Sequence, residues 1–323
     1  MTASSATVSA ADNPGITRKR VGKRWKYFGA NGQEITAAAE LDRLNRIGLP
    51  PAYQNAWYSP DPATPIQATG YDQRGRRQYR YHPEYRAGQE ADKFDRCIEF
   101  GRRLPKLRAQ VERDLAGDPY AKATVVAAVI RVLDECRIRI GNRAYARANK
   151  SFGATTLLRR HMRLGKTEIA FAFIGKSGKA QNVTVTDSRV IAILTKLAKL
   201  PGQAVFQYCG ADEAIFGVTP SDVNLYIQDT IGGNFSAKFF RTWHASASAL
   251  REALSMATRG QQPTPKDLAV PVSEELGNTP AIARKSYIHP EVIDAAVSGD
   301  LPVPVRASKW LDRGENTLLA MYD

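Results

Sequence analysis

A change of pattern near residue 88 constrains the fold more than any other feature of this sequence. Before it, five prolines between residues 50 and 65 exclude a long helix, and the stretch from Ile66 to Tyr81 predicts two strands joined by a turn at Gly75. After it, apolar residues recur at helical spacing. We therefore expect an α+β protein with a small, mostly β domain at residues 17–88 and a larger, mainly α domain at residues 89–323. Residues 1–16 have little to bury and are expected to be a disordered tail.

The N-terminal domain opens with a basic cluster, which either solubilises the chain or contacts a polyanion. Trp25, Tyr27 and Phe28 predict a strand that enters a tight turn at Asn31-Gly32. A short helix is expected over residues 36–46. The cluster consists of Arg18, Lys19, Arg20, Lys23, Arg24 and Lys26.

The C-terminal domain contains one strongly apolar helix and one recognisable hairpin. A valine-rich stripe predicts a helix over residues 122–137. Alternation over 167–174, and again at Val183 and Val185, predicts a β-hairpin whose tip is Gly175 to Lys179. Thr-Pro pairs at 219–220 and 279–280 are typical helix starts. Further helices are expected at 188–200, 219–230, 236–257 and 264–276.

The charge balance indicates a polyanionic partner. The chain has 46 Lys+Arg against 32 Asp+Glu, a net charge of +14, and a pI near 9.7. Residues 1–90 contribute 13 cations and 8 anions, net +5, so both domains are basic and a polyanion gripped between them would explain the distribution. No apolar run approaches the ~18 residues of a membrane span, and no signal peptide is recognisable. Three widely spaced cysteines predict neither a disulfide scaffold nor a zinc site, and favour an intracellular protein.

Several common catalytic motifs are absent. Gly175-Lys176-Ser177 resembles part of a phosphate-binding loop, but the required glycine is Ala170 and the stretch lies between strands. The sequence has no dinucleotide-binding loop, and its four histidines lack metal-ligand spacing. No acidic cluster indicates a two-metal nuclease. Phosphoryl chemistry here would have to rely on basic side chains without a metal.

Four short motifs, each weak alone, occur together in one order. This order and spacing resemble the catalytic core of type IB DNA topoisomerases in the compact poxvirus and bacterial form, and more loosely that of tyrosine recombinases. The resemblance covers about residues 17–323 and includes an N-terminal strand, Gly75 to Tyr81, similar to that family's DNA-reading strand. The four motifs are Arg137 to Asn142 with Tyr145, the hairpin tip with Lys176, Ala237 to Trp243, and Leu276 to Pro280 followed by Ala283 to Tyr287.

The resemblance implies a metal-free phosphodiester chemistry. Tyr287 would attack the phosphorus and form a 3′-phosphotyrosyl bond. A free phenol has a pKa of ~10, so it needs a cationic environment. Arg139 and Arg241 would stabilise charge on the non-bridging oxygens. Lys176 would protonate the leaving 5′ oxygen. Asn278 stands where many members have histidine; it can donate a hydrogen bond but cannot titrate.

Each of these residues also has an ordinary interpretation when taken alone. Arg139 could be a surface residue of a helix, and Arg241 could lie on a solvated helix face. Tyr287 could be a half-buried core tyrosine. Lys176 could be an ordinary residue of a hairpin tip, with Lys179 as a rival for its role. The histidines are interpreted as structural, with His244 at most supporting Arg241.

The DNA-contacting residues implied by the resemblance are Gln78, Tyr79, Tyr81 and Tyr145. On a strand, Tyr79 and Tyr81 share one face and Gln78 lies on the other. Glutamine can recognise adenine with two hydrogen bonds, and tyrosine can contact phosphate or base edges. The alternative is that the two tyrosines simply pack on the sheet.

The implied function is the relaxation of supercoiled duplex DNA by a monomeric clamp that nicks one strand, lets it swivel and reseals it. Neither ATP nor a divalent metal nor another cofactor is expected, and the expected location is the cytoplasm, on the bacterial nucleoid. A tyrosine recombinase would need a helical N-terminal domain, which residues 17–85 do not predict. A non-catalytic DNA-binding protein would explain the charge but not the four motifs.

Overall fold

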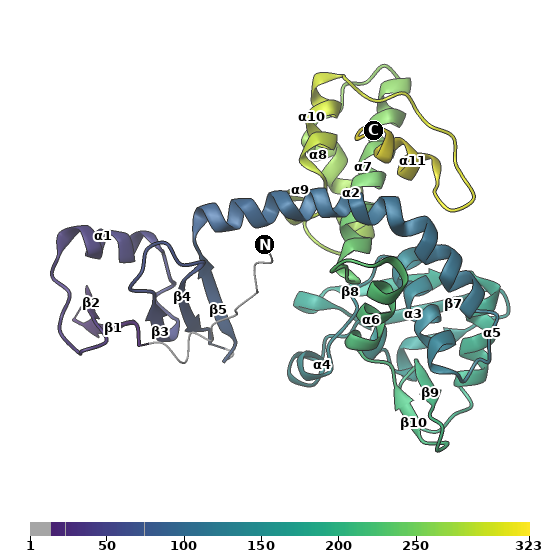
Figure 1. Ribbon diagram of the computed structural model, residues 1–323, viewed down its shortest axis with the longest axis horizontal. Helices are drawn as coiled ribbons and strands as arrows, with labels where there is room; N and C mark the ends of the chain where they lie inside the picture. The colour runs from purple at the N-terminus through teal and green to yellow at the C-terminus, as the bar shows by residue number, and fades with distance from the viewer. Residues whose placement is uncertain (1–13, 23, 74) are drawn as a thin grey trace. The chain divides into compact units, whose positions relative to one another are not determined.

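The computed structural model describes residues 14–22, 24–73 and 75–323. Residues 1–13 of the expected disordered tail and Lys23 of the basic cluster lie outside the described residues. Ile16, the last residue of that expected tail, is instead buried and begins the first strand. Contacts divide the chain into two compact units, residues up to Lys93 and residues from Phe94. The first contains a five-stranded sheet, and the second is mainly helical (Figure 1). The α+β expectation is confirmed.

The N-terminal unit contains an antiparallel sheet on which helix α1 (Ala38–Arg46) packs. Tyr27 and Tyr58 meet edge to face at 5.4 Å in its core, beside the buried Leu44 of α1. The strand order is β2-β1-β3-β4-β5, so β2 and β5 are edges. The strands are β1 (Ile16–Val21), β2 (Arg24–Phe28), β3 (Gln54–Tyr58), β4 (Ile66–Tyr71) and β5 (Arg77–Tyr81).

The described residues of the basic cluster do not form a tail, because they lie in strands β1 and β2, which pair with each other. The Arg18 guanidinium donates to the Leu49 carbonyl at 2.8 Å and to the Tyr58 hydroxyl at 3.0 Å. It also lies 4.3 Å from the Trp25 ring. Arg18 is half-buried, and these contacts engage its guanidinium inside the N-terminal unit.

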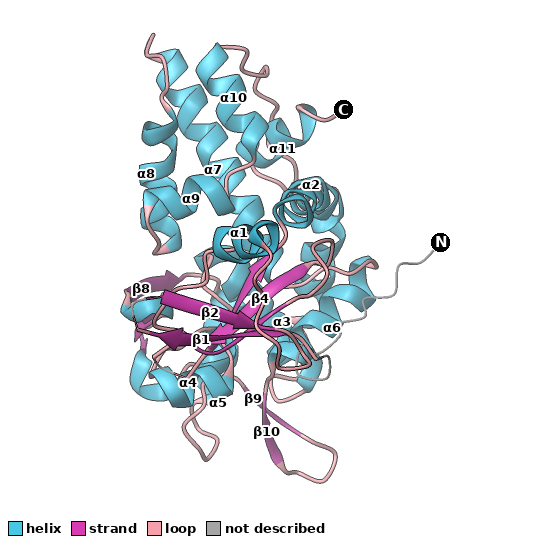
Figure 2. Ribbon diagram, turned by 90° about the vertical axis from the view of Figure 1, so that its left-hand side faces the viewer, coloured by secondary structure: helices cyan, strands magenta, loops and turns pink. Residues whose placement is uncertain are grey.

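The C-terminal unit is built around two buried helices, α3 (Lys122–Cys136) and α7 (Lys238–Thr258). Phe239, Phe240 and Trp243 of α7 are almost fully buried, which accounts for the apolar composition of its first turns. Figure 2 shows α8, α10 and α11 gathered around α7. The other helices are α2 (Pro83–Asp114, which crosses the boundary between the units), α4 (Arg143–Asn149), α5 (Ser188–Leu197), α6 (Pro220–Ile231), α8 (Pro265–Leu276), α9 (Pro280–Ser286), α10 (Pro290–Ser298) and α11 (Arg313–Ala320).

Strands form a minor part of this unit. The predicted hairpin is present as β7 (Ile169–Ile174) and β8 (Ala180–Val185), with β6 (Met162–Leu164) added at one edge. Ile169, Phe171 and Phe173 point into the core, as the alternation predicted. A second small hairpin, β9 (Gln207–Cys209) and β10 (Ile215–Gly217), was not expected.

A buried charge network joins α2, α3, α7 and α11. Arg108 binds Asp134 through two hydrogen bonds and also contacts Glu315. Nε2 of His244 lies 2.7 Å from Asp134, and the Trp243 indole donates to Glu315 at 2.8 Å. Breaking one member of such a network would leave an unpaired buried charge, so it fixes how these helices pack. His244 therefore has a structural role, as expected.

Candidate active site

Tyr287 is placed by a short, well-defined helix. Thr279 caps α9 by accepting a hydrogen bond from the Ile282 amide at 3.3 Å, and Pro280 occupies the first turn. The Tyr287 amide donates to the Ala283 carbonyl at 3.0 Å, and the helix ends there. The half-buried phenol is therefore presented from a rigid helix end.

Arg241 lies beside this phenol. Its guanidinium carbon is 5.0 Å from the centre of the Tyr287 ring. Its Nη2 donates to the Leu276 carbonyl at 2.9 Å, and its Nη1 donates to the Arg137 carbonyl. Only 4% of Arg241 is exposed, so the alternative of a solvated helix face is wrong.

The electrostatics of this pair differ from those of free side chains. Burial, followed by the nearby charge of Arg139, lowers the pKa of Arg241 from 12.5 to about 10. Burial raises the pKa of the Tyr287 phenol, but the charges and hydrogen bonds of Arg241 and Arg139 outweigh it, so the net pKa lies below 10. The site therefore makes the phenol easier to ionise than a free tyrosine.

Arg139 is brought to the site by a loop rather than by the valine-rich helix. α3 ends at Cys136, one residue earlier than expected, and Arg137 adopts a left-handed conformation. The Arg139 carbonyl accepts a hydrogen bond from the Ala154 amide at 2.9 Å. A Cβ on Gly153 would approach that carbonyl to 2.4 Å, which explains why glycine is required there. Arg139 is half-buried, so it is not a fully exposed surface residue.

Asn278 has a buried side chain with unused hydrogen-bonding capacity. Its amide nitrogen and oxygen both lack a partner, although 9% of the residue is exposed. Its backbone is fixed, because its N–H donates to the Ser273 carbonyl at 3.0 Å. The Nε of Arg241 is also buried and unpaired. Buried polar atoms without a protein partner are rare in folded proteins, and these atoms are available to hydrogen-bond another polar group.

The two lysines of the β7–β8 tip have different surroundings. Nζ of Lys179 donates to the Asn278 carbonyl at 3.0 Å, which ties the base of the tip to the site. Lys176 lies in the turn itself and is exposed. In the part of the chain that the structure describes, its ammonium has no hydrogen-bond or ion-pair partner.

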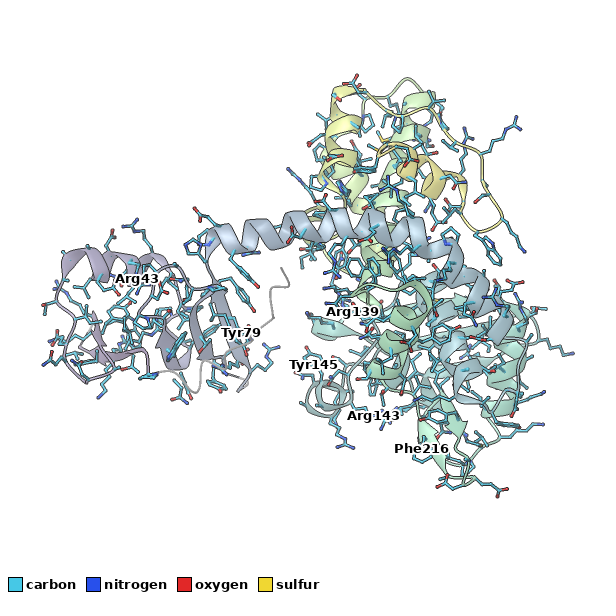
Figure 3. The ribbon with its side chains drawn as sticks, in the orientation of Figure 1. Arg43, Tyr79, Arg139, Arg143, Tyr145 and Phe216 are labelled. Carbon is cyan, nitrogen blue, oxygen red and sulfur yellow. The ribbon has the colours of Figure 1, made fainter. Side chains whose placement is uncertain are left out.

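Tyr145 is on α4, whose start is capped by Asn142 accepting from the Tyr145 amide at 3.0 Å. Figure 3 shows Arg139, Tyr145 and Arg143 along one flank of the C-terminal unit. Sequence reasoning missed a groove of about 370 Å³ beside α4. The spacing of Arg143, Arg147 and Lys150 on one helix face could have indicated it. Four cations line the groove: Arg143, Arg147, Lys150 and Arg160.

In the N-terminal unit, Tyr79 and Tyr81 lie on the edge strand β5; Figure 3 labels Tyr79. Their rings stack at 6.1 Å, as expected for residues on one face, and they are 43% and 47% exposed. Tyr81 also stacks on Tyr85 at 6.1 Å, so the two rings are partly packed and partly exposed, and their contact with DNA stays a prediction. Nε2 of Gln78 donates to Asp72 at 3.1 Å.

The described residues contain neither a cluster of metal-ligating side chains nor a membrane-spanning helix. No group of three or more His, Cys, Asp or Glu side chains in residues 14–22, 24–73 and 75–323 could hold a metal ion. Within the same ranges, no helix is long and apolar enough to cross a membrane.

Comparison with known proteins identifies the family. The profile described as "Eukaryotic DNA topoisomerase I, catalytic core" matches residues 82–285, and "Bacterial DNA topoisomerase IB, N-terminal domain" matches residues 24–72. DNA topoisomerase 1B of Acanthamoeba polyphaga mimivirus is 33% identical over 85% of each chain. The chain belongs to the type IB DNA topoisomerases. It is an enzyme that binds DNA and relaxes it through a covalent tyrosine intermediate.

More distant similarities extend to poxviruses and recombinases. DNA topoisomerase 1B of Vaccinia virus (strain Western Reserve) is 22% identical over 75% of each chain. Among solved structures, the XerH site-specific recombinase in a post-cleavage complex gives a TM-score of 0.38 at 15% identity, covering 60% of this topoisomerase and 50% of the XerH chain. A likeness this partial does not bear on function.

Proposed function

We propose that Tyr287 is the nucleophile of this topoisomerase and forms the 3′-phosphotyrosyl bond. The observation that carries this assignment is the position of its phenol, 5.0 Å from the guanidinium of a buried arginine and with a lowered pKa. A phenol with a lowered pKa ionises more readily, and the phenolate is the stronger nucleophile toward phosphorus. The bond that breaks joins phosphorus to the 5′ oxygen, and the new bond stores its energy for resealing.

Arg139, Arg241 and Asn278 would bind the non-bridging oxygens of the scissile phosphate. The unpaired Arg241 Nε and the unpaired Asn278 amide nitrogen are donors that such an oxygen would satisfy. The two guanidinium groups would neutralise the charge that grows in the transition state. Asn278 would contribute a neutral hydrogen bond and no proton transfer.

Lys176 would protonate the leaving 5′ oxygen. Its exposed position on the hairpin tip leaves its ammonium available to DNA, whereas Lys179 is engaged with the Asn278 carbonyl. When the strand is resealed, the resulting amine would take the proton back from the attacking 5′ hydroxyl.

The remaining assignments concern DNA recognition. Tyr79 and Tyr81 offer an exposed aromatic surface on β5, and Gln78 could exchange Asp72 for a base edge. Tyr145 would contact DNA from α4. Residues 17–88 and 89–323 would act as the two halves of a monomeric clamp on duplex DNA, preferably supercoiled, on the nucleoid in the bacterial cytoplasm.

A plasmid-relaxation assay in EDTA tests the proposal. Wild-type protein should relax supercoils alone, without ATP, and Tyr287→Phe should not. A recombinase would instead need paired sites, and a non-catalytic DNA-binding protein would relax nothing in either form. Relaxation by Tyr287→Phe would refute the assignment of the nucleophile.

A further inference from the structure

An ion pair joins two of the segments that carry the proposed catalytic residues. Nη1 of Arg137 lies 2.6 Å from the Glu275 carboxylate. Arg137 is two residues before Arg139, and Glu275 is three residues before Asn278. The ion pair therefore ties the loop after α3 to the end of α8.

The same two segments hold Arg241. Its guanidinium donates to the Arg137 carbonyl and to the Leu276 carbonyl, which is adjacent to Glu275. Glu275 also accepts from the Ser248 hydroxyl of α7 at 2.7 Å. Bonds thus run from α7 to α8, from α8 to Arg137, and from Arg137 back to Arg241 on α7, in a closed ring.

The backbone of Arg137 is strained, and the contacts that Arg137 makes to Arg241 and Glu275 explain why the strain is retained. Its φ is +56°, in the left-handed region. This conformation is energetically unfavourable for every residue that has a Cβ atom, and glycine avoids the penalty. This conformation turns the Arg137 carbonyl toward Arg241 while the side chain contacts Glu275. Such strain persists where surrounding contacts over-determine it, commonly at functional sites.

We propose that Arg137 and Glu275 are positioning residues that hold Arg241 and Arg139 in place around Tyr287. The inference rests on the proposed function, since it assigns a role relative to those catalytic residues. Neither residue needs to touch the scissile phosphate. Their ion pair fixes the carbonyl acceptors that orient the Arg241 guanidinium.

Arg137→Gly separates this role from a merely structural one. Glycine removes the ion pair but relieves the left-handed strain, so the melting temperature should stay within about 2 °C of wild type. Single-turnover cleavage of a DNA duplex and religation should both slow by about 10-fold, because a small misplacement of a clamp is costly in both directions. The Kd for DNA should not change.

Glu275→Gln tests the other half of the pair without altering the backbone. It should also slow cleavage by about 10-fold, and the double variant should be no slower than the slower single variant. In both variants the pH–rate profile of cleavage should move to higher pH, because displaced arginines hold the Tyr287 pKa down less strongly. Glu112→Gln is the matched control, since it removes a half-exposed carboxylate from its ion pairs with Arg189 and Arg131, neither of which belongs to the ring around Arg241.

Three results would overturn the inference. Wild-type cleavage rates in both variants would show that the ion pair positions nothing. A weaker Kd for Arg137→Gly would show a direct DNA contact, and additive rate losses in the double variant would show that the residues act separately. A covalent adduct formed by Tyr287→Phe would instead remove the proposed nucleophile, whatever these variants do.

Discussion

Replacing Arg241 with methionine should make the free protein more stable and almost inactive. Burial, and after it the charge of Arg139, holds the pKa of Arg241 at about 10 in the folded protein, against 12.5 for the free group, and no carboxylate contributes to this shift. Each pKa unit corresponds to about 1.4 kcal/mol, so the buried cation costs about 3 kcal/mol at neutral pH. Folding disfavours the charged form of Arg241, so the buried cation lowers the stability of the folded protein. This loss of stability is present in full below pH 10 and disappears above pH 12.5.

The variant also loses two hydrogen bonds, which reduces the stability that it gains from removing the buried charge. The carbonyls of Arg137 and Leu276 lose their donor, which offsets about 1–2 kcal/mol. The net gain of about 1–2 kcal/mol should raise the melting temperature of free Arg241→Met by roughly 2–8 °C. Cleavage should nevertheless fall by about 10²–10³ or more, as when a charge-stabilising donor is removed.

Differential scanning calorimetry without DNA and single-turnover cleavage measure the two effects. Arg241→Lys is the matched control, because it keeps a buried cation and should not gain stability. If Arg241→Met loses both stability and activity, Arg241 stabilises the fold. That result would refute the reasoning that its buried charge destabilises the free protein and is retained to bind phosphate.

Three further predictions address other residues. Lys176→Ala should cleave a substrate with a 5′-bridging sulfur much better than the normal substrate, since sulfur departs without a proton; equal defects would make Lys179 the candidate acid. The wild-type pH–rate profile for cleavage should level off below the ordinary phenol pKa of ~10, and Arg139→Met should move that point to higher pH; an unmoved profile would remove Arg139 from the phenol. Tyr79→Ala combined with Tyr81→Ala should weaken DNA binding and blunt cleavage-site preference in the intact protein, while rates at saturating DNA stay near wild type; unchanged binding and preference in a filter-binding and sequencing assay would exclude β5 from the interface.

The sequence predicted the regular elements where a local pattern decides them. The valine stripe of α3 and the alternation of β7 follow from burial on one or more faces, and Thr279 with Pro280 fixes the start of α9. α4 and α11 were not predicted, because they are short and owe their stability to tertiary contacts.

The site was predicted through the order of its motifs, and its geometry was not. Nothing local to Arg241 shows that it is buried against two carbonyls, since both acceptors are distant in sequence. The same holds for Arg18, which looks like a surface cation in the sequence and is fixed by Tyr58 in the structure. The unpaired amide of Asn278 also depends on the fold around it.

The most direct test of the account is to identify the residue that carries DNA. A duplex whose short 3′ fragment is lost on cleavage traps the covalent complex, and protease digestion with mass spectrometry locates the modified peptide. The account predicts a single adduct, joined through a 3′-phosphate to Tyr287 and absent from Tyr287→Phe. An adduct on another residue such as Tyr145, or one joined through a 5′-phosphate, would contradict it.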